Sequence, residues 1–275
     1  MNKLSENIDD NIQTAGELFP IGTSFDLITR DLYLGDTRGY WIGINGFCKT
    51  EILQQIFSDL QNPLYMKDSV VENIQNYMNA RIGYAQASLT DDWDTIVRNV
   101  LSGPSVLLID GFAQAIILDV RSYPTRGPSE PTVEKSVRGA RDGFIEHIML
   151  DLGMVRRRIR DPKLVTKAYQ KGSRTKTDIF VLYISDLIHP SILHDFQNRI
   201  DHLPANAEVT SERQLCELMY GQTWNPYPHV RYTERPDIAA IHLLQGSLII
   251  LVDNCPSAVI LPTTFFEQTK QIEEY

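Results

Sequence analysis

Two distant segments of this chain repeat one another, and the repeat narrows the folds that the chain can adopt. Segments 101–118 and 244–261 align without a gap, and each contains a glycine, an apolar run, an aspartate and a second apolar run. Two apolar runs separated by turn residues predict a β-hairpin. Because both runs are apolar on both faces, we expect central strands of a sheet. The identical pairs are Leu101/Leu244, Gly103/Gly246, Leu108/Leu251, Asp110/Asp253, Ala115/Ala258, Ile117/Ile260 and Leu118/Leu261.

A second match precedes the first in each copy. Segment 44–60 resembles segment 184–200, since each has a short apolar run, a turn and then apolar residues at helical spacing. The alternative is a chance likeness, because glycine, aspartate and aliphatic residues recur in α/β proteins. Two matches in the same order favour duplication of one structural unit.

The repeat predicts an α/β fold with two similar subdomains, each a small mixed β-sheet with flanking helices, joined by an extended and helical linker. We expect the subdomains at 24–122 and 177–265 and the linker at 123–176. Residues 1–23 are largely polar and are expected to form a mobile N-terminal segment. Residues 266–275 are expected to begin the connection to a further part of the protein.

The linker has two parts. Residues 123–131 contain three prolines, which favour an extended conformation. Beyond them, apolar residues at spacings of 4, 4, 3 and 4 predict an amphipathic helix, which Pro162 should end. The apolar stripe of this helix is Phe144, Ile148, Leu152, Val155 and Ile159.

Charge argues against a general nucleic-acid binder, because the net charge of −9 opposes contact with phosphates. A basic run inside the linker departs from this average. We expect it either to be a solvated helix face with ion pairs to the acidic subdomains, or to contact a protein or a membrane surface. The run consists of Arg156, Arg157, Arg158, Arg160, Lys163, Lys167, Lys171, Arg174 and Lys176.

The chain contains cysteines and histidines, which occur in many active sites, but they do not have the spacing that such sites require. Cys48, Cys216 and Cys255 are far apart and lack the spacing of a zinc site, and His189 and His194 do not share one helix face. The glycine-containing turns lack the sequence of a phosphate-binding loop. We therefore expect no enzyme activity, no cofactor and no metal site.

Acidic and basic residues alternate along the linker. The charged residues are Glu130, Glu134, Arg138, Arg141 and Asp142, and the spacing from Glu134 to Arg138 is that of a helical ion pair. Paired carboxylates can serve acid–base catalysis, but each acid here has a nearby arginine that should keep it ionised. Structural clamping is therefore the favoured interpretation.

Short motifs are spread over almost the whole chain beyond residue 30, and they are specific in combination. They are Ser129-Glu130-Pro131, Val137-Arg138-Gly139, Arg141-Asp142-Gly143-Phe144, Arg156-Arg157-Arg158-Ile159, Glu234-Arg235-Pro236-Asp237, Val252-Asp253 with Pro256, and Leu261-Pro262-Thr263-Thr264-Phe265-Phe266. Together these motifs resemble the GerA-type spore germination protein family.

The resemblance implies that the chain is the soluble N-terminal domain of a spore inner-membrane protein. Because the polar N-terminus lacks the apolar core of a signal peptide, we expect this domain on the cytoplasmic (core) side. A multi-span, ion-conducting membrane domain would follow residue 275. The implied function is assembly and signal coupling during spore germination. The implied partners are other spore germination membrane proteins and further copies of the same chain.

The resemblance leaves two choices open. The protein is either an accessory protein or the A subunit of a germinant receptor, and the domain is alternatively a small-molecule (germinant) binding module with a pocket between its two subdomains. The interface and linker candidates are Glu130, Glu134, Arg138, Arg141, Arg156, Arg157, Arg158, Glu234, Arg235 and Asp237.

Overall fold

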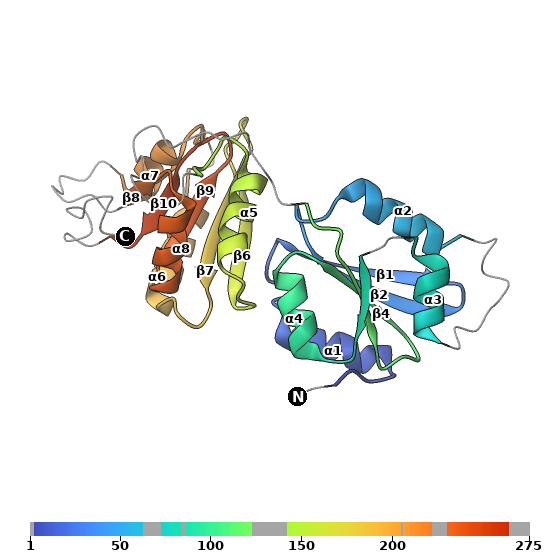
Figure 1. The fold of residues 1–275 in the computed structure, drawn as a ribbon. Coiled ribbons are helices and arrows are strands. Elements are labelled where there is room, and N and C mark those ends of the chain that lie inside the picture. Colours follow the sequence, from blue (N-terminus) through green and yellow to red (C-terminus); the bar gives the residue numbers. More distant parts are fainter. Residues whose placement is uncertain are drawn as a thin grey trace. The chain divides into compact units, whose positions relative to one another are not determined.

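The chain divides into two compact units, each with its own sheet and its own helical layers (Figure 1). Unit 1 consists of Met1–Pro124 with Arg160–Pro162, and unit 2 of Thr125–Ile159 with Lys163–Tyr275. The computed structural model describes residues 3–62, 73–83, 86–122, 142–204, 206–221 and 230–263.

Unit 1 is built on a five-stranded antiparallel sheet in the order β1-β2-β4-β5-β3. Local signals start and end its elements; for example, Asp92 caps α4 by accepting the N–H of Thr95 at 3.0 Å. In chain order the elements are α1 (Ile8–Leu18), β1 (Leu27–Leu34), β2 (Thr37–Ile44), α2 (Thr50–Leu60), α3 (Ile74–Arg81), β3 (Ala87–Thr90), α4 (Trp93–Leu101), β4 (Ser105–Ile109) and β5 (Ala115–Leu118).

Helices cover both faces of this sheet. Because side chains alternate along a strand, Tyr40 and Ile42 of β2 pack with α1 and α4, whereas Trp41 packs with α2 and α3. The central strands are therefore buried on both faces, which explains why the runs at β4 and β5 are continuously apolar.

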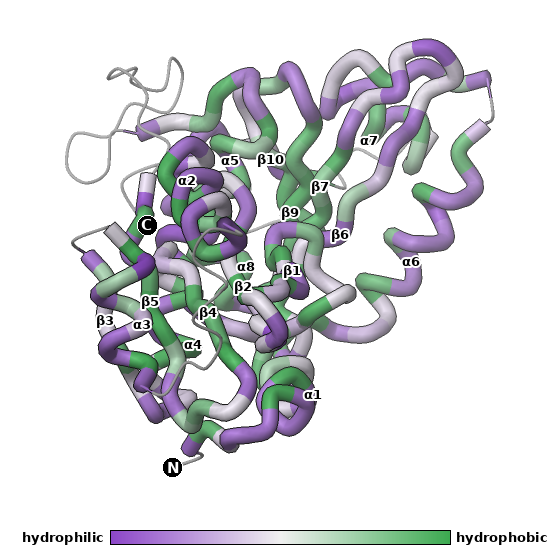
Figure 2. Tube along the Cα trace, turned by 90° about the vertical axis from the view of Figure 1, so that its right-hand side faces the viewer, coloured by the Kyte–Doolittle hydropathy of each residue, from purple (hydrophilic) through white to green (hydrophobic). Residues whose placement is uncertain are grey.

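Unit 2 has the same architecture, with a sheet in the order β6-β7-β9-β10-β8. α5 and α8 cover one face and α6 and α7 the other. Figure 2 shows the apolar strands β9 and β10 in green, whereas α6 alternates between purple and green. The elements are α5 (Ile148–Arg158), β6 (Leu164–Lys171), β7 (Thr177–Ile184), α6 (Pro190–Asp201), α7 (Glu212–Tyr220), β8 (Arg231–Thr233), α8 (Pro236–Leu244), β9 (Leu248–Val252) and β10 (Ala258–Leu261).

The duplication predicted from the sequence is confirmed, since helices and strands follow one another in the same order in both units. The predicted hairpins are β4–β5 and β9–β10. Their turns place Gly111 and Asn254 at equivalent positions with positive φ (83° and 64°), a conformation that glycine and asparagine tolerate. The sequence predicts mixed sheets, but every pairing between described strands is antiparallel, both in the hairpins β1–β2, β4–β5 and their counterparts and in the pairs between them.

The aspartate shared by the two hairpins has a structural role. Asp110 Oδ1 accepts the N–H of Ile8 at 3.1 Å, and Asp253 Oδ1 accepts the N–H of Ile148 at 3.4 Å. Each aspartate therefore binds the first turn of the helix that opens its unit, where N–H groups lack helical partners.

The prediction of a mobile N-terminal segment at 1–23 is wrong. Residues Ile8–Leu18 form α1, whose apolar face packs into the core of unit 1. Polar residues between the apolar positions hide a helical stripe with spacings of 4, 4, 3 and 4, the same as in the predicted helix of the linker. The stripe is Leu4, Ile8, Ile12, Ala15 and Phe19.

The predicted amphipathic helix is present as α5, and its apolar stripe lies in the core of unit 2. The segment predicted as a linker at 123–176 thus contributes α5 and β6 to unit 2, where they match α1 and β1 of unit 1. Residues 123–141 of that segment lie outside the described residues. Among the helices that the structure describes, none combines the length and the apolar character needed to cross a membrane.

Candidate functional site

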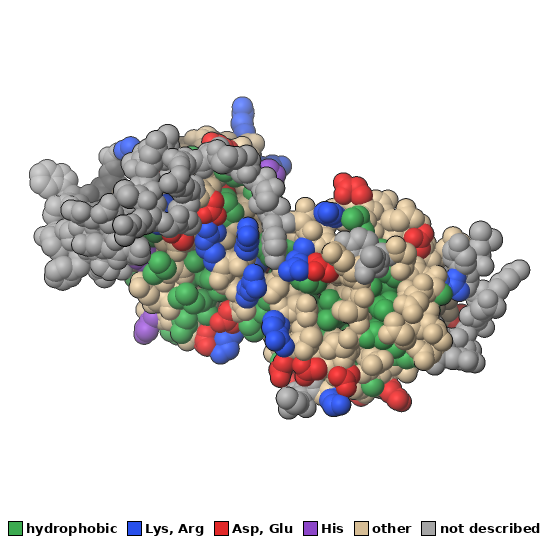
Figure 3. Space-filling model, viewed as in Figure 1, with side chains coloured by type: hydrophobic (Ala, Val, Ile, Leu, Met, Phe, Trp, Pro, Cys, Tyr) green, Lys and Arg blue, Asp and Glu red, His purple; other side chains and the backbone are tan. Residues whose placement is uncertain are grey.

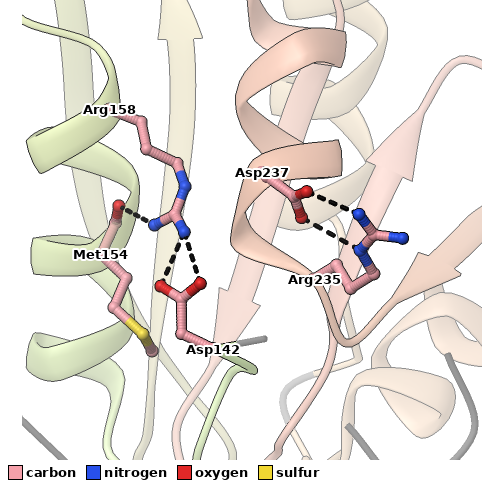
Figure 4. A network of polar contacts seen from close by, with 5 residues as sticks. All are labelled: Asp142, Met154, Arg158, Arg235 and Asp237. Carbon is pink, nitrogen blue, oxygen red and sulfur yellow. Dashed lines mark hydrogen bonds and ion pairs between the residues drawn. The ribbon is translucent and has the colours of Figure 1, made fainter. Parts of the chain in front are cut away.

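Three of the motifs found in the sequence meet at one place in unit 2. Asp142, Arg158, Arg235 and Asp237, which we call the arginine cluster, come from the residues before α5, the end of α5 and the start of α8 (Figure 4). α5 and α8 lie on the same face of the sheet. A backbone hydrogen bond of 2.8 Å from Phe144 N to the Glu234 carbonyl joins the segment entering α5 to the turn before α8.

Arg158 ties the last turn of α5 to the residues that precede the helix. Its Nη1 donates to the Met154 carbonyl at 2.9 Å, and its Nη2 lies 2.6 Å from both carboxylate oxygens of Asp142 (Figure 4). A cation at a helix C-terminus is favourable because the carbonyl groups there carry partial negative charge. The pair therefore closes a loop of 16 residues onto the helix end.

Arg235 shapes the turn between β8 and α8. Its Nε and Nη2 bind the two oxygens of Asp237 at 3.1 and 2.6 Å, and its side chain is only 4% exposed. A buried cation is stable only with a close partner, and a two-pronged carboxylate contact supplies one. The Arg235 N–H also donates to Thr233 Oγ1 at 3.1 Å, so the whole turn is tied to β8.

The three consecutive arginines of α5 have different environments, because successive residues point in different directions around a helix. Arg156 is buried and donates to the Leu164 carbonyl at 2.9 Å, which joins α5 to the start of β6. Arg157 is exposed, and Arg158 belongs to the arginine cluster. In Figure 3 several Lys and Arg side chains (blue) lie over the part of unit 2 where Figure 1 draws α5.

The basic run from 156 to 176 is not one helix face, since it continues from α5 through β6 into the next hairpin loop. Lys163 pairs with Asp186, and Lys171 lies 3.9 Å from Asp201. Arg158, Lys163 and Lys171 of the run therefore form ion pairs within unit 2, and contact of the run with a protein or a membrane surface stays a prediction.

A carboxylate missed by the sequence analysis organises the hairpin loop after β6. Glu208 accepts hydrogen bonds from the Ser173 hydroxyl and from the backbone N–H groups of Arg174 and Thr175, at 3.1 and 3.0 Å for the latter two. The Ser173 hydroxyl, followed by these N–H groups, lowers the pKa of Glu208 to about 2. The partners are more than 30 residues apart in the chain, so spacing could not reveal them.

The cysteines of unit 2 are poor nucleophiles at neutral pH. Burial raises the pKa of Cys216 to about 11 and that of Cys255 to about 12, which leaves little thiolate. In the described part of the chain, no group of three His, Cys, Asp or Glu side chains could hold a metal ion. The chemistry of the arginine cluster is ion pairing that ties elements together.

Of the predicted residues, the structure brings together Arg158, Arg235 and Asp237, and the backbone of Glu234 lies beside them. Arg156 and Arg157 are close to Arg158 in sequence but lie outside the arginine cluster, since Arg156 binds the Leu164 carbonyl and Arg157 is exposed. The remaining predicted residues, Glu130, Glu134, Arg138 and Arg141, lie outside the described residues. Asp142 was not among the candidates, although it directly follows Arg141 in a recognised motif.

Comparison with known proteins decides the family. The family model for the Bacillus/Clostridium GerA spore germination protein matches residues 18–275. The chain belongs to the GerA spore germination protein family. The match includes all three motifs that meet at the arginine cluster.

Two relatives within the GerA family show how far the likeness extends. Stage V sporulation protein AF of Bacillus subtilis (strain 168) is 38% identical over 258 residues, which are 93% of this chain and 52% of that protein. Spore germination protein KA of the same organism is 26% identical over 257 residues, 93% of this chain and 47% of that protein. The chain thus spans about half the length of the curated relatives that it matches.

A solved structure shows the same fold. The N-terminal domain of the A subunit of the Bacillus megaterium spore germinant receptor GerK3 matches with a TM-score of 0.70 and 24% identity. The match covers 96% of this chain and 98% of that one. This likeness confirms the predicted α/β fold with two similar subdomains.

Proposed function

We propose that this chain is the non-enzymatic N-terminal part of a spore germination membrane protein, and that it couples a signal to an ion-conducting membrane part during germination. The observation that carries the proposal is the arginine cluster. The segment of unit 2 that leads from Asp142 into α5 is held to α5 by Arg158 and to the turn before α8 by the Phe144–Glu234 hydrogen bond. A displacement of that segment would therefore move two helices of the same layer.

The proposed setting is the spore inner membrane, with this part on the cytoplasmic (core) side and with other spore germination membrane proteins and further copies of the chain as partners. Membership of the GerA family supports it. One relative, YfkQ of Bacillus subtilis, is described as a membrane protein, and the solved neighbour comes from the A subunit of a germinant receptor. Both descriptions place related chains in membranes or in multi-subunit assemblies.

Substitutions in the full-length protein test the coupling role. Asp142→Asn and Arg158→Gln each weaken the ion pair at the end of α5, and we expect both to slow germination of spores that carry them. The charge-swapped double variant, Asp142→Arg with Arg158→Asp, should recover part of the rate. The measurement is the time course of ion release from spores after a germination stimulus.

A matched control separates coupling from a general loss of charge. Arg213→Gln removes an arginine of unit 2 whose ion pair with Glu217, at 3.0 Å, is largely exposed on α7. This variant should germinate at the normal rate. Normal germination in both Asp142→Asn and Arg158→Gln, with unit 2 folded, would rule out the coupling role of the arginine cluster.

A further inference from the structure

Two buried polar groups in unit 1 have no hydrogen-bond partner in the part of the chain that the structure describes. They are the indole Nε1 of Trp41, whose residue is 6% exposed, and the hydroxyl Oγ of Ser105, whose residue is 0% exposed. Buried polar groups in proteins nearly always have partners, because leaving one unsatisfied costs stability. Each group is therefore available to a molecule that the chain itself does not supply.

The two groups are neighbours on one face of the sheet. β2 and β4 pair with Trp41 opposite Leu107 and Ile42 opposite Val106, so the next position in this register places Gly43 opposite Ser105. The Trp41 ring lies over Gly43, where an added Cβ would be 2.5 Å from ring atom Cζ2. The indole thus extends along β2 toward the position across from Ser105, on the face covered by α2 and α3.

The beginning of α2 lies at the same end of the sheet. Leu118 of β5 pairs with Ser105, and two residues later the Val120 carbonyl accepts the N–H of Lys49 at 2.9 Å. Lys49 is the N-cap of α2, and its side chain makes no capping hydrogen bond. The first N–H groups of a helix favour negative charge, so this end of the sheet suits an anion.

Unit 2 provides an internal comparison for the same place. Trp41, Gly43 and Ser105 correspond to Val181, Tyr183 and Leu248. In unit 2 these three side chains belong to the apolar core. Unit 1 therefore has hydrogen-bonding groups at Trp41 and Ser105, where unit 2 has the aliphatic Val181 and Leu248, whereas the Tyr183 hydroxyl of unit 2 stands where unit 1 has Gly43.

The start of the helix that covers the site also differs between the two units. In unit 2, α6 begins with Pro190, and the side chain of its N-cap residue His189 accepts the N–H of Ser191 at 3.3 Å. α2 of unit 1 has neither feature. The two units thus differ at both walls of the site, the sheet face and the helix start.

We propose that unit 1 binds a small organic carboxylate between this sheet face and α2, with Trp41 Nε1 and Ser105 Oγ donating to its oxygens. The carboxylate matches the two donors and the anion preference of the helix start. Phe57 of α2 stands edge-on to Trp41, with 5.7 Å between the two ring centroids, and offers an apolar contact for the organic part of the ligand. The site goes beyond the signal-coupling function and does not depend on it.

Thermal unfolding of the 275-residue chain tests the site. Sodium acetate, propionate and benzoate are each compared with sodium chloride at equal ionic strength. At least one carboxylate should raise the midpoint in a concentration-dependent way, because a ligand that binds the folded state alone stabilises it. Trp41→Phe, which removes the N–H and keeps an aromatic ring, should weaken the apparent affinity about tenfold or more.

Ser105→Leu, which installs the residue of unit 2, should abolish the rise in midpoint, and Ser105→Ala tests the hydroxyl alone if the larger side chain prevents folding. Tyr183→Phe, at the equivalent place in unit 2, should leave the rise unchanged. Either of two results overturns the proposal: none of the three carboxylates shifts the wild-type midpoint, or the shift persists in both Ser105 variants. A crystal structure grown with the carboxylate that raises the midpoint, and holding only water between the two donors, overturns it as well.

Discussion

Asn11 and Asp151 occupy equivalent positions in the two units, and each accepts a backbone N–H from the residue six positions earlier. Asn11 Oδ1 binds the N–H of Ser5 at 2.9 Å, and Asp151 Oδ1 binds the N–H of Ile145 at 2.8 Å. Both side chains are buried although both are polar. In both units the first helix thus carries a buried polar side chain that binds the backbone of the segment before the helix.

Removing either anchor should destabilise its unit. Asn11→Ala and Asp151→Ala leave a backbone N–H without its acceptor, and we expect each to lower the free energy of unfolding by about 1–3 kcal/mol. Asp151→Asn keeps an oxygen acceptor and should cost less than Asp151→Ala. Urea unfolding measures all three, and equal stability of wild type and both alanine variants would contradict an anchoring role.

The buried pair in the arginine cluster should matter more than an exposed pair. Asp237→Ala removes the carboxylate that neutralises the buried Arg235 guanidinium, and we expect a loss of about 2 kcal/mol or more. Glu217→Ala, which breaks an exposed pair on α7, should cost less than about 1 kcal/mol. Chemical denaturation of the two variants side by side makes the comparison, and similar losses would show that burial of Arg235 is not decisive.

Glu208 should make the loop after β6 sensitive to acid. The pKa of Glu208 in the folded state, about 2, lies below its ordinary value of 4.5, so its contribution to stability is complete above about pH 4.5 and is lost as the pH falls toward 2. Glu208→Gln removes the charge and should flatten the decline in stability over this window. Unfolding midpoints between pH 5 and pH 2.5 test this, and parallel curves for wild type and variant would count against it.

The N-terminal helix should be part of the folded core. Phe19 is 2% exposed, and Phe19→Ala should cost about 3–5 kcal/mol because it removes a large side chain from the core of unit 1. Phe25 lies nearby in sequence but is 43% exposed, and Phe25→Ala should cost less than about 1 kcal/mol. Thermal unfolding of both variants distinguishes a packed α1 from a mobile one.

Much of the central architecture could be predicted because it follows from continuous apolar runs. β4, β5, β9 and β10 are buried on both faces, so their sequences are apolar without interruption. The edge strand β1 could not be found this way. It is exposed along much of its length and carries Arg30 and Asp31 among its apolar residues, which breaks the apolar run.

The candidate site was predictable only where its partners are close in sequence. Arg235 and Asp237 stand two residues apart and form their pair within one turn. Asp142 and Arg158 are 16 residues apart, and their pairing requires the chain before α5 to run back along the helix. Trp41 and Ser105 become neighbours only through the register of β2 and β4, which no local pattern specifies.

The hydrogen bond from the Ile8 N–H to Asp110 has a consequence for synthesis on the ribosome. Its partners are 102 residues apart, so α1 emerges long before β4 and Asp110, although β2, which also packs on α1, follows sooner. At about 5–20 residues per second, the nascent chain carries an incompletely covered amphipathic helix for roughly 5–20 s. α5 faces the same delay, because its partner Asp253 follows Ile148 by 105 residues. The duplication therefore presents the cell twice with an interval in which a chaperone has an apolar helix face to hold.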